Sequence, residues 1–492
     1  MTSVALPRAA AAPLAISMRA VAGTAFGLLA LPHLLLGSFL GFSAPVLGLS
    51  AIAIAVLGVL FARGFSGAIP AHTAIACLAI ATGLCLLGGE GRIFHANLDW
   101  QVRDAVLRDL VVYPWPFAYA GADRLILRLP SAMYLLPALI GKASGVGTAQ
   151  VALLACNSVL LGSLFALGAA LFEGSRERRI AISLLVAFSG LDALGKLLMA
   201  QPVSDHIEWW SSQQYSSMLT LLFWVPQHAI AGWTAALLYL LWRAGRIGLP
   251  VLLVPMPLLA LWSPLALAGA MPFLAHAGMA RLLDRGLRPA DLLPALAALA
   301  VAIPSLLYLA TGSGGAVGGG ERPMRWPEHL LFVSIEVVPY LLAIARTRET
   351  MRFGGATLAI TGATLLLLPL ASRSGDINLV MRLSIAPLAI LAVQTADLLI
   401  RSKTSSNNRL WATVVAIALM IGAVTPALEI ARAIRLPVNP IRPCSYLAVV
   451  PGGAPTYVAP LARLPSPIRP VGAAIARPED RPACRETILQ RR

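Results

Sequence analysis

Three aspartates in one polar stretch are the residues of this chain best suited to acid–base chemistry. Asp99, Asp104 and Asp109 follow one another at intervals of five residues, within the longest polar interruption of an otherwise apolar sequence. A carboxylate can take a proton from an attacking hydroxyl group, which makes each of them a candidate general base. We therefore expect the chemistry of this protein in this stretch, with Asp99 and Asp104 as the catalytic candidates.

The same stretch carries the pattern of a short amphipathic helix. Its apolar residues fall four apart and share one helix face, and they are Leu98, Val102, Val106 and Leu110. A helix this short and this charged should lie at the membrane interface, with Asn97 as its N-cap. The pairs Asp99 with Arg103 and Asp104 with Arg108 are then also spaced as ordinary ion pairs that only support the helix.

A second polar set lies in residues 201–217. Asp205, His206 and Glu208 stand there beside Trp209 and Trp210. Acids can accept hydrogen bonds from sugar hydroxyls while indole rings cover the apolar face of a sugar, and the alternative is an aromatic belt at the membrane surface. The two acids and the histidine also offer ligands for a divalent cation, although their spacing follows no metal motif. We expect no other cofactor.

Further polar residues complete the candidate substrate-binding set. Gln227 and His228 follow Pro226 within a predicted span, and Glu336 lies in another, where ionisable groups mark a cavity or a contact between helices. Guanidinium groups form charge-assisted bonds to phosphate oxygens, and the candidate arginines are Arg103, Arg124, Arg128, Arg373 and Arg382. Arg124 and Arg128 stand one turn apart in a second predicted amphipathic segment, residues 123–136. Ordinary loop charges or contacts with bulk lipid head groups are the alternative interpretation of these arginines.

The composition shows which elements must position these residues. Hydrophobic residues make up 58% of the 492-residue chain and charged residues 12%, and the mean hydropathy is +0.78. Apolar runs of about 20 residues, the length that crosses a membrane as a helix, recur along the chain. We expect an all-α polytopic bundle of about thirteen spans, at residues 20–39, 43–62, 70–88, 147–172, 179–196, 222–242, 248–262, 265–282, 290–310, 329–345, 354–370, 383–400 and 410–429.

The distribution of positive charge predicts the orientation of these spans. With the N-terminus in the cytoplasm, inward segments receive 17 Lys and Arg residues, whereas the short outward loops receive 5 and the long outward loop 89–146 receives six. The first long loop and the C-terminal tail should thus both face outward, from a bacterial inner membrane. The net charge of +16 is largely topological, and no aromatic residues interleave with basic runs as a nucleic-acid site would require.

The expected organisation has three parts. Residues 1–64 hold two extra spans, residues 65–430 form the transmembrane core with the 89–146 loop, and residues 431–492 form a Pro-rich outward tail. In that tail Cys444 and Cys484 would face an oxidising compartment and form a disulfide, or else remain as two unpaired thiols.

Several segments resemble the GT-C superfamily of integral membrane glycosyltransferases, in particular its uncharacterised bacterial multi-span members. They are Asp99-Trp100, Ala105 to Leu110, Trp115-Pro116, Phe223 to His228 and Met381 to Ile385, within an architecture that covers residues 65–400. The resemblance implies a polyprenyl-phosphate sugar donor and a glycan, lipid or protein acceptor. It also implies an acidic base in the first outward loop, which by position is Asp99. Family members often carry two acids close together in this loop, whereas Arg103 stands here between Asp99 and Asp104.

Other functions fit the same composition. A transporter or lipid flippase would also have many spans, intramembrane Glu and His, and interrupted helices, but the sequence has no clear repeat of two halves. A polysaccharide polymerase or ligase would more often have its largest outward loop nearer the C-terminal half, and a noncatalytic membrane scaffold is a further alternative. The sequence therefore favours glycosyl transfer at the outer face.

Overall fold

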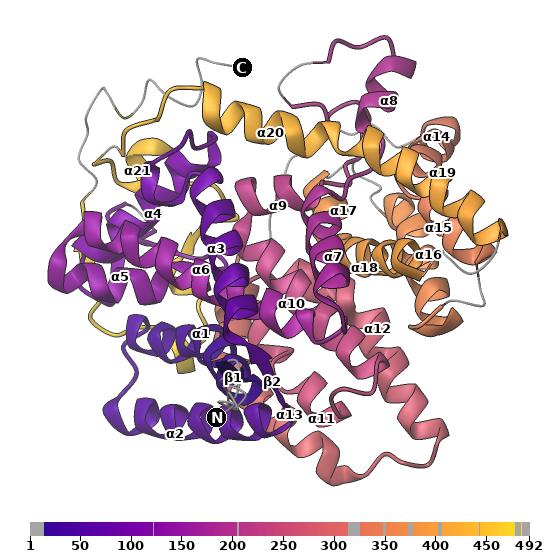
Figure 1. Ribbon diagram of the computed structural model, residues 1–492. Helices are drawn as coiled ribbons and strands as arrows, with labels where there is room; N and C mark the ends of the chain where they lie inside the picture. Colours follow the sequence, from indigo (N-terminus) through magenta and orange to yellow (C-terminus); the bar gives the residue numbers. More distant parts are fainter. Residues whose placement is uncertain are drawn as a thin grey trace, which may run out of the picture.

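The structure is a computed structural model that describes residues 14–121, 123–203, 206–312, 325–347, 351–371, 377–401, 406–441, 443–477 and 484. It is 71% helix and 4% strand, which confirms the predicted all-α class. Figure 1 shows a bundle in which α20 crosses one end, near α4 and α21, while α2, α11 and the two N-terminal strands lie at the other.

Several helices of the bundle are long and apolar enough to cross a membrane. In the described ranges there are seven, or eight if one bent helix pair is counted as a single span. The seven are α1 (Met18–Phe39), α2 (Ala44–Arg63), α6 (Val146–Ala169), α7 (Ser175–Ala187) with α8 (Asp192–Leu198), α12 (Pro264–Leu283), α13 (Pro289–Ala310), and α19 (Ser406–Gly422) with α20 (Val424–Arg435). The chain is a membrane protein, and the predicted count of thirteen spans is not confirmed.

The difference in number arises because several apolar segments form short or broken helices. These are α3 (Ala71–Leu87), α9 (Met218–Trp224), α10 (Pro226–Arg243), α11 (Leu249–Leu253), α14 (Trp326–Glu336), α15 (Val338–Arg346), α16 (Gly354–Ala371), α17 (Ile377–Leu383) and α18 (Ile385–Arg401). The pair α14 and α15 is bent by 56°. The length of an apolar run predicts a span. It does not show whether a proline within the run ends one helix and starts another.

One such break positions the candidate site. Val225 has non-helical backbone angles (φ −139°, ψ 55°), and Pro226 follows as the first residue of α10, where its missing N–H costs no hydrogen bond. Gln227 and His228 thereby lie in the first turn of α10. This helix is buried along nearly its whole length and packs against α6, α9, α12 and α18.

The helix predicted in the long loop is confirmed as α4 (Asp99–Val112), followed by α5 (Ala132–Ser144). Helix α4 is not a one-sided interfacial helix, because residues 103–111 are buried on all its faces while Leu98 of the predicted apolar face is exposed. The second predicted amphipathic segment, residues 123–136, is not one helix. Its residues Leu125–Leu127 form strand β4, and α5 begins only at Ala132. The prediction is wrong because β4 pairs with residues 117–119 of the same loop and with residues 458–460 of the distant tail, and helical periodicity reveals neither pairing.

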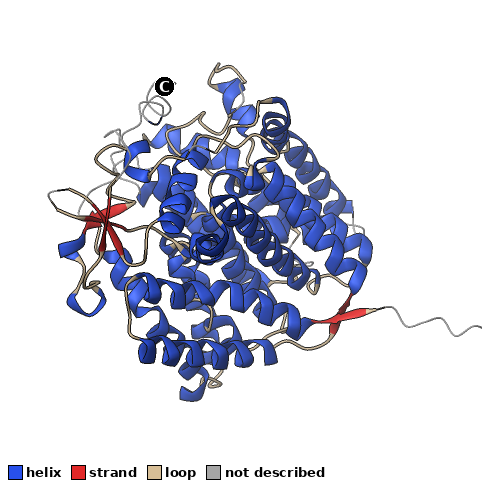
Figure 2. Ribbon diagram, turned by 90° about the vertical axis from the view of Figure 1, so that its left-hand side faces the viewer, coloured by secondary structure: helices blue, strands red, loops and turns tan. Residues whose placement is uncertain are grey.

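A small sheet joins the long loop to the tail. Its strand order is β5 (Val458–Pro460), β4, β3 (Phe117–Tyr119) and β6 (Ala474–Ala476), with β3 parallel to β6 and the other pairs antiparallel. A second, two-stranded sheet pairs β1 (Ala15–Ser17) with β2 (Ala68–Pro70) on the opposite side of the molecule (Figure 2). Because β3 and β6 share hydrogen bonds, the loop and the tail lie next to each other in the fold. That both face outward from the membrane stays a prediction.

The tail is fixed further by α21 (Tyr446–Val449), which packs on α4. Cys444 and Cys484 form a disulfide, which is one of the two states expected from the sequence. The division of the chain into three parts remains a prediction.

Candidate functional site

Asp99 opens α4 and reaches solvent. Asn97 ties this end of the helix to the bundle, because its side-chain oxygen accepts a hydrogen bond from the Asp99 amide (3.0 Å) and its amide nitrogen donates to the Phe223 carbonyl (2.8 Å). The carboxylate of Asp99 is 49% exposed and lies 3.9 Å from the Arg103 guanidinium. Asp99 is thus an accessible base with a cation beside it.

Arg103 is buried and connects the long loop to the break between α9 and α10. Its Nη1 donates to the Gln227 side-chain oxygen (2.7 Å) and to the Tyr134 hydroxyl (3.2 Å), and its Nη2 donates to the Trp224 carbonyl (2.6 Å). These bonds satisfy only part of the guanidinium, because its buried Nε has no partner in the described part of the chain. Arg103 is therefore an organising cation of the site.

Gln227, His228 and Arg382 complete this first group. The Gln227 amide nitrogen lies 3.5 Å from the His228 Nε2. Arg103 and Arg382 both act electrostatically on His228, whose Nδ1 is buried without a partner among the described residues. Arg382 lies near the end of α17 and bonds the Asn378 side chain at 3.3 Å. Segments far apart in the sequence thus contribute to this group, with Arg382 linked to it through its electrostatic effect on His228.

A second group adjoins the first through Trp224. The Trp224 carbonyl accepts from Arg103, and its indole nitrogen donates to Glu429 (3.1 Å). Glu429 also accepts a bond from His206 Nδ1 (3.1 Å) and pairs with Arg432, whose guanidinium lies 4.9 Å from the Trp224 ring. This group combines a histidine, a carboxylate and a cation next to an aromatic surface.

Sequence reasoning missed Trp224, Glu429 and Arg432 as site residues. One available signal was that Glu429 is the only charged residue of the predicted span 410–429. A carboxylate at the end of an apolar segment costs free energy unless other groups bond it. The position of Glu429 therefore indicated that it has partners elsewhere in the chain. The pairing with His206, 223 positions earlier, could be found only in the folded structure.

Asp104 occupies a more closed environment than Asp99. It is 6% exposed, pairs with Arg92 and accepts a bond from the Gln150 amide (3.0 Å). Burial raises its pKa, and the Arg92 charge offsets part of that shift. It faces a cavity of about 40 Å³ that Asn439 helps to close. A cavity of this size does not admit a sugar ring, since small-molecule sites measure roughly 300 Å³ or more.

Glu208 is also enclosed. Its carboxylate accepts bonds from the Gln214 side chain (2.6 Å) and the Ser217 amide (2.9 Å). Burial raises its pKa to about 7, because the buried charge loses its hydration while these bonds compensate only in part. Glu208 therefore helps to hold residues 206–217 in their conformation, because both of these bonds lie within that segment.

The remaining candidates do not join the Asp99 group. Arg124 lies exposed next to β4, and the Arg128 guanidinium donates to the Leu309 carbonyl at the end of α13. Asp205 and Arg373 lie outside the described residues. Within the described ranges no three His, Cys, Asp or Glu side chains are grouped to hold a metal ion. Binding of a divalent cation by Asp205, His206 and Glu208 stays a prediction, because Asp205 lies outside the described residues.

Comparison with known proteins gives no relative: no family model, curated protein or solved structure matches the chain. The resemblance to GT-C enzymes thus depends on the motifs quoted above, and the function must be argued from the site.

Proposed function

We propose that this protein is an integral membrane glycosyltransferase that moves a sugar from a polyprenyl-phosphate donor to a glycan, lipid or protein acceptor. The observation that supports it most is the series of contacts from Asp99 to Arg103 and on to Gln227, with His228 beside Gln227 and Arg382 close enough to act electrostatically on His228. An accessible carboxylate, two cations and two neutral hydrogen-bonding groups match the needs of this transfer.

In the proposed reaction an acceptor hydroxyl oxygen attacks the anomeric carbon of the donor sugar. The new C–O bond forms while the bond from that carbon to the phosphate oxygen breaks, and the phosphate leaves with the electron pair. Asp99 takes the hydroxyl proton. Arg103 and Arg382 offset the charge that grows on the leaving phosphate, where guanidinium groups are well suited to phosphate oxygens.

The neutral groups hold the reactants. Gln227 and His228 offer donors and acceptors to sugar hydroxyls, and Trp209 and Trp224, whose rings lie 6.3 Å apart beside His206, offer an apolar face. We place this site on the extracytoplasmic face of the bacterial inner membrane, with the C-terminal tail on that face and the N-terminus in the cytoplasm. The charge distribution of the short loops supports this orientation.

One observation favours a transporter or flippase as a second candidate. The bend between α14 and α15 places Glu336 at the break of a candidate span, where it is buried and accepts a bond from the Trp210 indole (2.9 Å). Broken helices with ionisable groups at membrane depth are typical of transport sites.

A transfer assay separates these functions. The purified protein is reconstituted into liposomes that contain radiolabelled polyprenyl-phosphate sugars, with a membrane lipid extract as the acceptor source. We expect the label to move from the donor to a new product, and protein-free liposomes are the control. Movement of intact donor between leaflets, measured by its access to an impermeant reagent and without product formation, would replace the enzyme by a transporter.

A further inference from the structure

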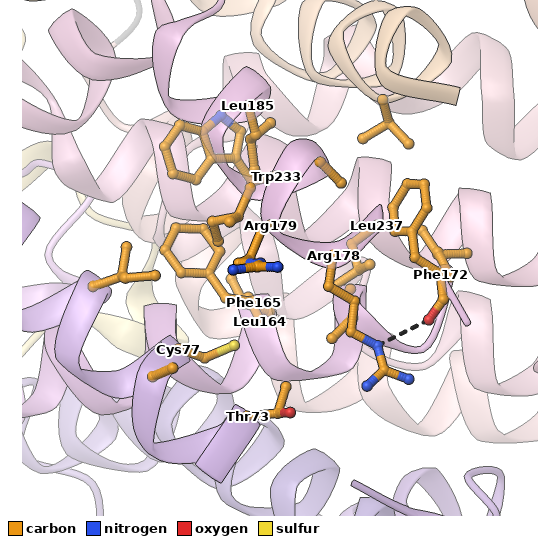
Figure 3. Close-up of a pocket in the computed structure, with 18 of the residues that line it drawn as sticks. Thr73, Cys77, Leu164, Phe165, Phe172, Arg178, Arg179, Leu185, Trp233 and Leu237 are labelled. Atoms are coloured by element: carbon orange, nitrogen blue, oxygen red, sulfur yellow. Dashed lines mark hydrogen bonds between the residues drawn. The ribbon is translucent and has the colours of Figure 1, made fainter. Parts of the chain in front are cut away.

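A separate apolar cavity lies within the bundle, toward the end away from Asp99. It has a volume of about 430 Å³ and lies between α3, α6, α7, α10 and α18. Figure 3 shows Trp233 and Leu185 near one end of the cavity and Thr73 near the other, with the side chains of Arg178 and Arg179 between them in this view. The walls are otherwise dominated by aliphatic and aromatic side chains, including Leu164, Phe165 and Leu237.

The position of the cavity along the bundle follows from the helices that line it. The residues from α3 come from its start and middle, and those from α10 come from its middle and later part, beginning at Trp233. The first turn of α10 carries Gln227 and His228, so the cavity extends from mid-helix toward the opposite end. That end of the bundle carries arginines that the charge count assigns to the cytoplasm, among them Arg176 at the start of α7 and Arg246 after α10.

The polar part of the cavity is positively charged. Arg178 and Arg179 lie in the first turns of α7, and Arg178 Nε donates to the Phe172 carbonyl at 2.9 Å. No Asp or Glu lines the cavity in the described part of the chain. The nearby Glu177 carboxylate accepts bonds from the backbone amides of residues 173 and 174 and so serves the helix start.

We propose that this cavity binds an anionic phospholipid of the cytoplasmic leaflet. One acyl chain occupies the apolar space beside Trp233, and the phosphate group lies against Arg178 and Arg179. An apolar cavity of this size favours a hydrocarbon chain, and two guanidinium groups near it favour a ligand with negative charge. The cavity lies at the end of the bundle whose arginines the charge count assigns to the cytoplasm. The lipid should therefore come from the cytoplasmic leaflet of the bilayer. This site is independent of the proposed transfer reaction.

Trp233 offers a direct reporter, because it lines the cavity and is only 7% exposed. The full-length protein is reconstituted in phosphatidylcholine that contains a small fraction of phosphatidylglycerol brominated in mid-chain, or the same fraction of brominated phosphatidylcholine. Bromine quenches tryptophan fluorescence on contact. The Trp233 contribution is the difference between wild type and Trp233→Phe. We expect brominated phosphatidylglycerol to quench this contribution at several-fold lower mole fraction than brominated phosphatidylcholine.

Variants identify the determinants of this preference. Arg178→Gln with Arg179→Gln should abolish the preference, since each basic residue near an anionic surface contributes about fivefold to affinity. Arg176→Gln is the matched control, because Arg176 does not line the cavity, and it should keep the preference. Gly168→Leu should reduce quenching by both lipids, because a side chain at this lining position occupies the cavity next to Leu237.

The outcomes that overturn the proposal are specific. Equal quenching of Trp233 by the two lipids in the wild type would show that no anionic lipid is selected. A preference that survives in the double variant would remove the assignment to Arg178 and Arg179. Unchanged quenching in a folded Gly168→Leu variant would place the lipid outside the cavity.

Discussion

The two ends of helix α4 hold aspartates in opposite environments. At the start of the helix, Asp99 is half exposed and has Arg103 as a neighbour at 3.9 Å. Near the end, Asp109 is fully buried and accepts four bonds, from Arg108 (2.8 Å), the Tyr119 hydroxyl (2.6 Å), the Ser445 hydroxyl (2.8 Å) and the Tyr446 amide (2.8 Å). One residue type thus serves two purposes on one helix.

The contrast has a physical basis. Burial raises the pKa of Asp109, and its donors lower it again, so its lone pairs are committed to the structure that surrounds it. Within the described ranges no donor bonds the Asp99 carboxylate, so its lone pairs remain accessible. An accessible and incompletely bonded carboxylate is the better base, whereas a fully bonded one is the better structural anchor.

The largest expected effect comes from Asp99→Asn. The amide keeps the shape of the side chain but cannot take the acceptor proton, so transfer should fall by about 10² to 10⁴-fold. Because the Asp99 carboxylate is half exposed and lies 3.9 Å from Arg103, which keeps its bonds to Tyr134, Gln227 and Trp224, thermal stability should change by less than about 0.5 kcal/mol. Initial rates of sugar transfer and thermal unfolding in detergent measure the two quantities.

Asp104→Asn is the matched control, since it makes the same chemical change five residues along the same helix. We expect a milder loss of activity there, together with some destabilisation, because Arg92 would lose its partner. Normal activity of Asp99→Asn beside an inactive Asp104→Asn would move the base to Asp104 and reverse the contrast between open and closed carboxylates.

The next effect is expected at the other end of the helix. Asp109→Ala leaves Arg108, Tyr119 and Ser445 without their common acceptor, and loss of one partner of a buried charged network costs about 3 to 5 kcal/mol. The variant should show a lower unfolding temperature and faster proteolysis of the tail. Asp99→Ala serves as the comparison, and equal destabilisation by both changes would contradict the assignment of Asp109 as an anchor.

A somewhat smaller effect is expected from the disulfide that stands next to this anchor. Cys444 precedes Ser445, and a link across a separation of 40 residues stabilises by up to about 4 kcal/mol in the chain-entropy model. Cys444→Ser with Cys484→Ser should therefore expose the tail to protease. Cys156→Ser, which alters a free thiol, should leave it protected. If the tail stays resistant to protease without the disulfide, Asp109 and the sheet are sufficient to hold it in place.

The same contrast explains how much could be predicted from the sequence. The α4 helix was predictable, because the four-residue spacing from Leu98 to Leu110 is local, whereas the break at Pro226 divides a segment that was predicted as one span, residues 222–242. Strand β4 and the anchoring of Asp109 were not predictable, because each depends in part on the tail, where β5 pairs with β4 and where Ser445 and Tyr446 donate to Asp109. The polar residues of the long loop were found by type, but only packing decides which of them are open to a substrate.

The smallest expected effect concerns Glu208, which is buried like Asp109 but, among the described residues, is bonded to no arginine or lysine. Its pKa is raised from 4.5 to about 7 by loss of hydration, with His206 opposing the shift and Asp192 adding to it. A raised folded-state pKa means that the folded protein holds the proton more tightly than the unfolded chain does. The stability that this proton provides is complete below pH 4.5 and is lost as the pH rises through about 7.

Glu208→Gln removes this dependence, because an amide resembles the protonated acid and does not titrate. The stability of the variant relative to wild type should therefore rise by as much as about 3 kcal/mol between acidic and mildly alkaline pH. Unfolding temperatures of both proteins across this range measure the difference, and Gln213→Glu, at another buried position of the same loop, should change it in the opposite direction. A constant difference between wild type and Glu208→Gln would mean that Glu208 titrates normally. The lack of a bonded cation would then have no effect on how the buried Glu208 carboxylate titrates, and the contrast with Asp109 would fail.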